Sequence, residues 1–188
     1  TEAAMPGVLY IVSTPIGNLE DITLRALRVL REVDCIAAED TRHTRKLLSH
    51  YGIEAKLISY WGGREKGRAE KVMALLERNR DVALVSDAGT PGISDPGGVL
   101  VRRAIDAGVD VVSVPGPSAF LSALTVSGIS TEGFVFLGFI PSRRHARRRF
   151  FDDISREQRT VVLYESPHRI IESLHDLSDV MPSRKVAL

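Results

Sequence analysis

The strongest constraint on the fold is a series of short apolar runs that alternate with longer segments of helical spacing. Most runs are continuously apolar, which is typical of strands buried on both faces of a parallel sheet. The predicted strands are residues 8–12, 34–38, 56–59, 82–86, 109–114, 134–139 and 160–164, and the predicted helices are residues 24–33, 42–51, 65–79, 99–107 and 118–127. The alternation predicts an α/β fold with right-handed crossovers and a doubly wound sheet.

A rigid break at Pro115-Gly116-Pro117 divides this pattern. A chain of 188 residues, of which 44% are hydrophobic, fits one medium domain or two small ones. We therefore predict an N-terminal α/β domain over residues 1–117 and a C-terminal α/β domain over residues 118–188. Residues 184–188 look like the start of a further strand. We expect the second domain to be incomplete here and the natural protein to continue.

The charge and the cysteine content exclude some classes of site and limit how the chain could bind nucleic acid. The net charge of +1 gives a weak overall field, so contacts with nucleic acid would need local clusters of charge. The single cysteine, Cys35, lies in an apolar run and is expected to be a buried structural thiol, so neither a disulfide framework nor a cysteine-based zinc site is possible within the chain. We predict no metal site. Because the sequence shows neither a secretory signal nor an apolar run of about 20 residues, the expected location is the cytoplasm, away from membranes.

Three loops that follow predicted strands combine glycine with proline: residues 13–18, 86–97 and 115–119. Glycine allows a ligand to approach the backbone closely, and proline stiffens the loop. Ligands of open α/β sheets bind at the carboxyl ends of the strands, where these loops lie. The chain has no phosphate-binding loop of the NTPase type and no G-x-G-x-x-G after its first strand, so a different ligand is expected.

Asp87 is the most informative residue of these loops, because it directly follows a buried strand. A carboxylate at that edge suits a ribose hydroxyl or a cationic ligand group. The alternative is a turn aspartate that bonds its own backbone. Asp95 precedes Pro-Gly and a predicted helix, so capping of that helix is at least as good an interpretation as ligand contact.

Six motifs in order give the chain a resemblance to a known family. They are Thr14-Pro15-Ile16-Gly17-Asn18-Leu19, Ala38-Glu39-Asp40-Thr41-Arg42, Ser86-Asp87-Ala88-Gly89-Thr90-Pro91, Ser94-Asp95-Pro96-Gly97, Pro115-Gly116-Pro117-Ser118 and Tyr164-Glu165-Ser166-Pro167-His168-Arg169. Together they resemble the tetrapyrrole methylase superfamily. Within it, they are similar to the bacterial branch that methylates the ribose 2′-hydroxyl of a cytidine in small-subunit ribosomal RNA. The resemblance covers nearly the whole chain.

The resemblance implies two α/β domains with S-adenosylmethionine bound in the cleft between them, and a homodimer. It also implies the residues that hold this cofactor. In this sequence they are Pro15, Gly17, Asp87, Ala88, Gly89, Thr90, Ser118, Ala119, Leu163 and Tyr164.

At one place the chain departs from the family. Members usually carry a His-x-His-Asn-Glu run after the third strand, where this chain reads Trp61-Gly62-Gly63-Arg64-Glu65 and shares only the glutamate. A divergent member could use a different acceptor. Trp61 beside two glycines is a candidate for stacking on an RNA base, and packing onto the domain edge is the equal alternative.

Methyl transfer to a hydroxyl needs a base within hydrogen-bond reach of the acceptor. Glu39 and Glu165 follow predicted strands and are the leading candidates, although Glu39 and Asp40 also suit a helix start. The remaining RNA candidates are Arg42 and a dense cluster of arginines after residue 141, namely Arg143, Arg144, Arg147 and Arg148, with Arg149 beside them. Arginine suits phosphate because its planar group can bind two oxygens at once.

Two other functions remain open at this point. One is a methyltransferase of the same superfamily that acts on a tetrapyrrole or another small molecule, against which the arginine cluster and residues 38–42 argue. The other is a non-catalytic RNA-binding fragment. An unrelated nucleotide-binding oxidoreductase is disfavoured by the absent dinucleotide motif.

Overall fold

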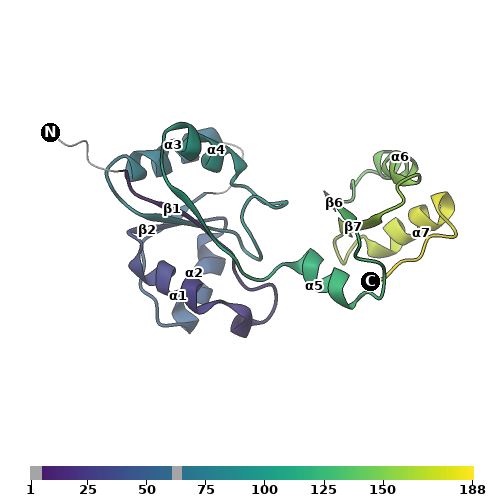
Figure 1. Cartoon of the computed structure of the whole chain (residues 1–188), viewed down its shortest axis with the longest axis horizontal. Helices are drawn as coiled ribbons and strands as arrows, with labels where there is room; N and C mark the ends of the chain where they lie inside the picture. Colours follow the sequence, from purple (N-terminus) through teal and green to yellow (C-terminus); the bar gives the residue numbers. More distant parts are fainter. Residues whose placement is uncertain (1–5, 61–64) are drawn as a thin grey trace. The chain divides into compact units, whose positions relative to one another are not determined.

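The computed structural model describes residues 6–60 and 65–188, and it consists of two compact units. The first unit ends at Ser118 and the second begins at Ala119 and runs to Leu188. Both units mix helices with parallel strands (Figure 1). The prediction of an α/β fold is confirmed.

The first unit is built around a five-stranded sheet in the order β3-β2-β4-β1-β5, in which every pairing is parallel. Its strands are β1 (Leu9–Val12), β2 (Cys35–Ala38), β3 (Leu57–Ser59), β4 (Val82–Val85) and β5 (Val111–Val114). Its helices are α1 (Leu24–Glu32), α2 (Thr41–His50), α3 (Glu65–Leu76) and α4 (Gly98–Asp106), with a short 3-10 helix, η1 (Leu19–Asp21).

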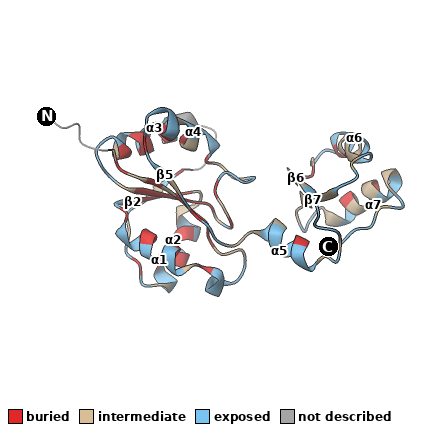
Figure 2. Cartoon of the chain, viewed as in Figure 1, coloured by how far each residue is buried: buried red, intermediate tan, exposed pale blue. Residues whose placement is uncertain are grey.

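Helices cover both faces of this sheet, with α1 and α2 on one side and α3 and α4 on the other (Figure 1). Successive residues of a strand point to opposite faces. In β2, Cys35 and Ala37 therefore belong to the core beneath α3 and α4, whereas Ile36 and Ala38 belong to the core beneath α1 and α2. All four are buried, and Figure 2 shows the sheet as the most buried part of this unit. Burial on both faces explains why the strands read as continuous apolar runs.

The second unit is a two-stranded parallel sheet of β6 (Phe134–Phe139) and β7 (Thr160–Tyr164) with three helices. The helices are α5 (Ala119–Val126), α6 (Arg144–Ile154) and α7 (Ile170–Val180). Aromatic rings join the sheet to α5: Phe120 stacks on Phe136 with ring centres 4.7 Å apart, and Phe136 meets Tyr164 edge-on at 4.9 Å. Aromatic contacts of this kind add to the stability gained by burial.

Two features of the second unit differ from the sequence-based expectation. The helices α6 and α7 are absent from the predicted helices. The buried residues of α6 are Arg147 and Phe151, and those of α7 are Ser173 and Asp176, so most of the buried positions are polar. In α7, Leu174, Leu177 and Val180 nevertheless stand at helical spacing, and this signal was missed. The expected strand over 184–188 is not formed, since neither β6 nor β7 pairs with this segment. Arg184 instead donates to the carbonyl oxygens of Glu157 and Arg159.

Among the described residues, no helix combines the length and the apolar character needed to cross a membrane.

Candidate functional site

The candidate site lies at the carboxyl ends of the parallel strands in the first unit. From β1 the chain crosses to β2 on one side, and from β4 it crosses to β5 on the other. The direction of the connections therefore reverses between neighbouring strands β1 and β4. Such a reversal leaves a crevice at the sheet edge, where α/β proteins bind their ligands.

The loops after β1 and β4 are joined at this edge by their backbones. Thr14 N donates to Gly89 O at 2.9 Å, and Gly89 N donates back to Thr14 O at 3.1 Å. The Thr14 hydroxyl donates to the carbonyl of Ser86 at 3.0 Å, and the hydroxyls of Ser13 and Thr90 lie 2.8 Å apart. These bonds hold the loop that carries Asp87 against the end of β1.

Two glycines make this packing sterically feasible. Gly89 has a φ of +81°, a backbone conformation that L side chains rarely adopt. Gly116, after β5, approaches Ser13 so closely that a Cβ there would lie 2.9 Å from the Ser13 Cβ. All three glycine-proline loops are thus tied to β1 or packed against it, and they form one continuous rim.

The carboxylates of Glu39 and Asp87 link the ends of β2 and β4, because each accepts a hydrogen bond from the backbone of the other strand end. Asp87 N donates to Glu39 Oε2 at 3.1 Å, and Asp40 N donates to Asp87 Oδ1 at 3.0 Å. Each carboxylate therefore fixes the backbone of the opposite strand end. Asp87 bonds a neighbouring strand rather than its own turn, so the turn interpretation does not explain its position.

A pocket of about 410 Å³ opens beside this pair. It is lined by Glu39, Asp40, Thr41, Arg42, Ser59 and Asp87, at the ends of β2, β3 and β4. Asp40 also caps α2, since its carboxylate accepts a hydrogen bond from Arg42 N, and the Arg42 guanidinium pairs with it at 2.7 Å. Asp40 therefore starts the helix, as its position in the sequence suggests, and it lines the pocket as well.

Three carboxyl groups at this edge, those of Glu39, Asp95 and Asp40, have shifted pKa values. Loss of solvent raises the pKa of Glu39, and the nearby charges of Asp95, Asp87 and Asp40 raise it further. The pKa of Asp95 is raised by burial and then by Asp87, against a hydrogen bond from Ser86. Asp95 does not cap α4, which begins after Gly97 without a side-chain cap. By contrast, hydrogen bonds from Arg42 hold the pKa of Asp40 far below its usual value.

Glu165, the second base candidate, is committed to other partners within the second unit. Its carboxylate pairs with Arg169 at 2.6 Å and accepts hydrogen bonds from Ser166 N and the Ser173 hydroxyl. Only 4% of its side chain is exposed. Because this carboxylate is buried and already occupied by three donors of its own unit, we withdraw Glu165 as a base.

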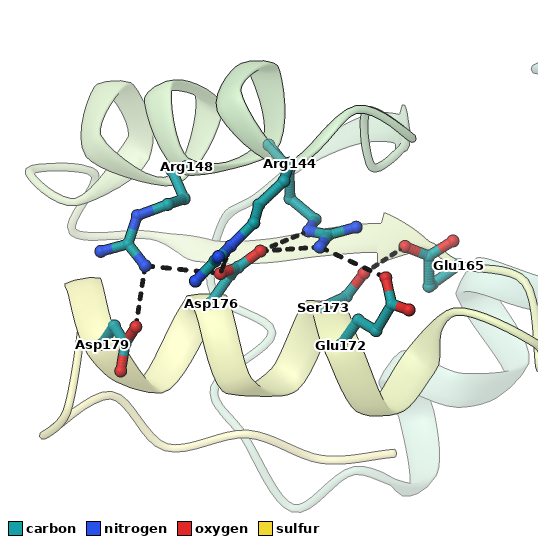
Figure 3. A network of polar contacts seen from close by, with 8 residues as sticks. Arg144, Arg148, Glu165, Glu172, Ser173, Asp176 and Asp179 are labelled. Atoms are coloured by element: carbon teal, nitrogen blue, oxygen red, sulfur yellow. Dashed lines mark hydrogen bonds and ion pairs between the residues drawn. The ribbon is translucent and has the colours of Figure 1, made fainter.

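The arginine cluster on α6 is partly turned inward (Figure 3). Arg147 is 2% exposed and donates to Asp176 through Nε at 2.8 Å and Nη2 at 2.7 Å. Arg144 and Arg148 also contact Asp176, and Arg148 pairs with Asp179 at 2.7 Å. Because a buried, paired guanidinium cannot reach a phosphate, we withdraw Arg147 as an RNA contact. The three arginines, through their contacts with the aspartates, join α6 to α7.

The other predicted cofactor residues are divided between the two units. Pro15, Gly17, Ala88 and Ser118 lie in the first unit, and Ala119, Leu163 and Tyr164 lie in the second. Trp61 lies outside the described residues, so its role stays a prediction. The sequence-based reasoning placed Ser13 and Thr41 in its motifs without assigning them to the site, and it missed Ser59. Each stands at a strand end or close after one, and that position is the signal that could have found them.

Among the described residues, no group of three or more histidine, cysteine, aspartate or glutamate side chains is placed to hold a metal ion.

A family model described as tetrapyrrole (corrin/porphyrin) methylases matches residues 8–188. Several similar proteins carry the name ribosomal RNA small subunit methyltransferase I. The one from Escherichia coli O157:H7 is 50% identical over 183 residues, which cover 97% of this chain and 64% of that protein. The one from Xylella fastidiosa is also 50% identical, with 97% and 67% covered, and the one from Synechocystis is 48% identical, with 91% and 61% covered. The chain thus spans about two-thirds of the length of these relatives or slightly less.

Solved structures share the fold at low sequence identity. The methyltransferase CobJ superposes with a TM-score of 0.68 at 19% identity, covering 93% of this chain and 76% of that one. Uroporphyrin III C-methyltransferase from Thermus thermophilus gives a TM-score of 0.67 at 18% identity, with 95% and 78% covered.

Proposed function

The chain belongs to the tetrapyrrole (corrin/porphyrin) methylase family, and from this premise we propose that it transfers a methyl group from S-adenosylmethionine to RNA. The observation that carries the proposal is the rim at the switch point. There the loops after β1, β4 and β5 pack together, and the loop after β4 carries a carboxylate, Asp87, whose orientation is fixed by the backbone of Asp40.

We propose that the acceptor is the ribose 2′-hydroxyl of a cytidine in small-subunit ribosomal RNA. The support is the resemblance of six motifs, together with relatives of 46–51% identity that are named as small-subunit ribosomal RNA methyltransferases. The same resemblance supports a homodimer that acts on the ribosomal subunit.

The residues at the rim fit the proposed cofactor. S-adenosylmethionine carries ribose hydroxyls, an ammonium and a sulfonium, all of which suit a carboxylate such as Asp87. The closeness of Gly116 to Ser13, where no Cβ fits, and the positive φ of Gly89 let the loops after β1, β4 and β5 pack together at this rim. The hydroxyls of Ser13 and Thr90 stand at the same rim. When bound, this cofactor supplies a methyl group that is already strongly electrophilic.

The protein's own task is then to align the acceptor and remove its proton. Positioning alone can lower a barrier by about 7 kcal/mol or more. We propose Glu39 as the base. Its Oε2 is held by Asp87 N, and its raised pKa makes its carboxylate a stronger base than an ordinary glutamate. Asp40 is unsuited, because Arg42 holds both of its oxygens.

Asp87→Asn is expected to weaken S-adenosylmethionine binding by at least tenfold, about 1.4 kcal/mol. The asparagine oxygen can still accept the Asp40 N–H, so the fold is preserved while the negative charge is lost. Calorimetry measures the affinity and a thermal melt checks the fold. Asp110→Asn, a change at an exposed position in the same unit, is the matched control. Unchanged affinity in a folded Asp87→Asn protein would contradict the assignment of the cofactor to this loop.

We further propose that the outward arginines of α6 contact RNA phosphates. Arg143 and Arg149 are exposed, and neither has an acidic partner among the described residues. Arg143 also stands at the start of α6, where the helix dipole disfavours a positive charge. A positive charge at this position destabilises the free protein, but it would stabilise a complex in which a phosphate is bound there.

The double variant Arg143→Gln, Arg149→Gln should weaken binding of single-stranded ribosomal RNA regardless of its sequence, because phosphate contacts carry no sequence information. Each lost contact should reduce the slope of log affinity against log salt by about 0.7. Filter binding over a salt series measures both quantities. The pair Arg25→Gln, Arg102→Gln removes the same charge from the first unit and should leave the slope unchanged. Equal slopes for both double variants would show that α6 is only a charged surface.

A further inference from the structure

The pocket at the ends of β2, β3 and β4 is separate from the rim proposed to hold the cofactor. In the order β3-β2-β4-β1-β5, the rim occupies the β4-β1-β5 half of the edge, whereas the pocket occupies the β3-β2-β4 half. The two halves share β4, and Asp87 follows that strand. A ligand in the pocket and a ligand on the rim would therefore meet at Asp87.

The pocket wall offers hydrogen-bond acceptors in fixed positions. Glu39 uses Oε2 to accept from Asp87 N, and Asp87 uses Oδ1 to accept from Asp40 N. Within the described part of the chain, the second oxygen of each carboxylate, Glu39 Oε1 and Asp87 Oδ2, has no hydrogen-bond partner. Both residues line the pocket, so the matching ligand presents hydroxyl or amino donors.

The pocket also has a positively charged residue, which lies on its solvent-exposed side. Arg42 lines it with a side chain that is 85% exposed, and its partner is Asp40. The Arg42 hydrogen bonds to Asp40 use Nε and Nη2, so the exposed guanidinium can also contact a phosphate while it stays paired with Asp40. Acidic groups inside and an arginine at the mouth suit a ligand with a neutral, hydroxyl-bearing part and a phosphate at one end.

A ribonucleotide has this arrangement of groups. The volume of about 410 Å³ falls within the range of about 300–1,000 Å³ that small-molecule pockets occupy. The described residues provide no metal-ion site that would explain the carboxylates otherwise. The 2′-hydroxyl is the group by which a protein distinguishes RNA from DNA, and a carboxylate is a strong acceptor for it.

We propose that this pocket is the subsite for the acceptor nucleotide, with the ribose 2′-hydroxyl on Glu39 and the phosphate on Arg42. The proposal rests on the proposed function, because the acceptor is taken to be an RNA ribose. It adds a location for that ribose and names Glu39 as the residue that selects ribose over deoxyribose. The RNA would bind as a single strand, with the acceptor nucleotide flipped out of its stack into the pocket.

The test is a titration of ¹⁵N-labelled protein with cytidine 5′-monophosphate and with its 2′-deoxy analogue, followed by NMR at the Asp40 and Asp87 amides. Both amides are bonded to pocket carboxylates and should shift on binding. The ribonucleotide should bind roughly tenfold more tightly, as expected for one hydrogen bond to a charged group. Equal affinities, or no shift of these amides at any soluble concentration, would overturn the proposal.

Two variants separate the assigned contacts. Glu39→Gln keeps an oxygen for the Asp87 N–H but removes the charge, so the preference for ribose should fall while the fold is kept. Arg42→Ala should reduce the affinity for cytidine monophosphate to that for cytidine and leave the ribose preference unchanged. Glu54→Gln and Arg45→Ala, at exposed positions outside the pocket lining, are the matched controls. Controls that behave like the two test variants would contradict the pocket assignment.

A titration of the same sample with S-adenosylmethionine keeps the two proposals apart. Cofactor binding together with equal affinities for the two nucleotides overturns the subsite and leaves the proposed function standing. Failure to bind the cofactor counts against the proposed function, and the subsite proposal falls with it.

Discussion

Replacing Asp176 by alanine is expected to lower the melting temperature of the second unit by on the order of 10 °C. The physical reason is the position of Arg147, whose guanidinium is buried and depends on Asp176 for its two short contacts. Arg147 Nη1 already lacks a partner among the described residues, and Glu172 lies 3.6 Å from Nη2. Without Asp176, a buried positive charge would remain almost uncompensated. Thermal melts and hydrogen exchange of the α6 and α7 amides measure the effect.

Asp179→Ala is the matched control, because it removes a carboxylate from the same helix whose side chain is 57% exposed. Its melting temperature should stay close to that of the unaltered protein. A similar loss for both variants would show that general charge on α7, rather than the buried pair, holds the helices together.

The Asp176 effect should also depend on pH. The hydrogen bond from Arg147 holds the pKa of this carboxyl below its usual value of 3.8. A lowered pKa in the folded state contributes stability that is present above 3.8 and is lost as the pH falls through the folded-state value. The difference in melting temperature between Asp176→Ala and the unaltered protein should therefore shrink in strong acid. A constant difference would contradict the ion-pair account.

Glu39→Gln is expected to reduce the rate of methyl transfer by about 10²–10⁴-fold, the usual contribution of a positioned base. Cofactor affinity should not change, since the glutamine oxygen can still accept the Asp87 N–H. Single-turnover assays on small ribosomal subunits measure the rate, and Glu54→Gln serves as the control. A rate near that of the unaltered protein would remove Glu39 as the base.

The pH profile distinguishes a base from a residue that only holds the loop. The base must be ionised, and burial together with Asp95, Asp87 and Asp40 raises the pKa of Glu39 above its usual 4.5. The rate should therefore rise with pH through that raised value and then level off. In Glu39→Gln this rise should disappear. A rise that persists in the variant would assign it to another group, of which Asp95, with its raised pKa, is the nearest candidate.

The sequence predicted the first unit well because its strands are buried on both faces. Cys35–Ala38 and Val82–Val85 are entirely buried, and a continuous apolar run followed by Gly, Pro or Asp is the direct consequence. The same reasoning placed Asp87 at the edge of the sheet, because residues that follow parallel strands gather there. The ends of the strands, and the loops that follow them, could therefore be predicted from the sequence.

The contacts that define the site could not be predicted from the sequence in this way. Glu39 and Asp87 are 48 residues apart, and the hydrogen bonds that their carboxylates accept from Asp87 N and Asp40 N depend on β2 and β4 being neighbours, which apolar spacing does not encode. The prediction that Arg147 contacts RNA failed for a related reason. Five arginines in a short segment indicate a charged surface, but Asp176, 29 residues after Arg147, draws that arginine into the interior.

Methyl transfer from labelled S-adenosylmethionine to unmethylated small ribosomal subunits, followed by alkaline hydrolysis of the RNA, tests the central claim most directly. A 2′-O-methyl group blocks cleavage of the adjacent phosphodiester, so the label should remain in an alkali-resistant dinucleotide that contains cytidine. Glu39→Gln and Asp87→Asn should abolish most of this product. Label found in mononucleotides would mean that a base is methylated, and the absence of label from the RNA would mean that this RNA is not the substrate. Either result would contradict the account.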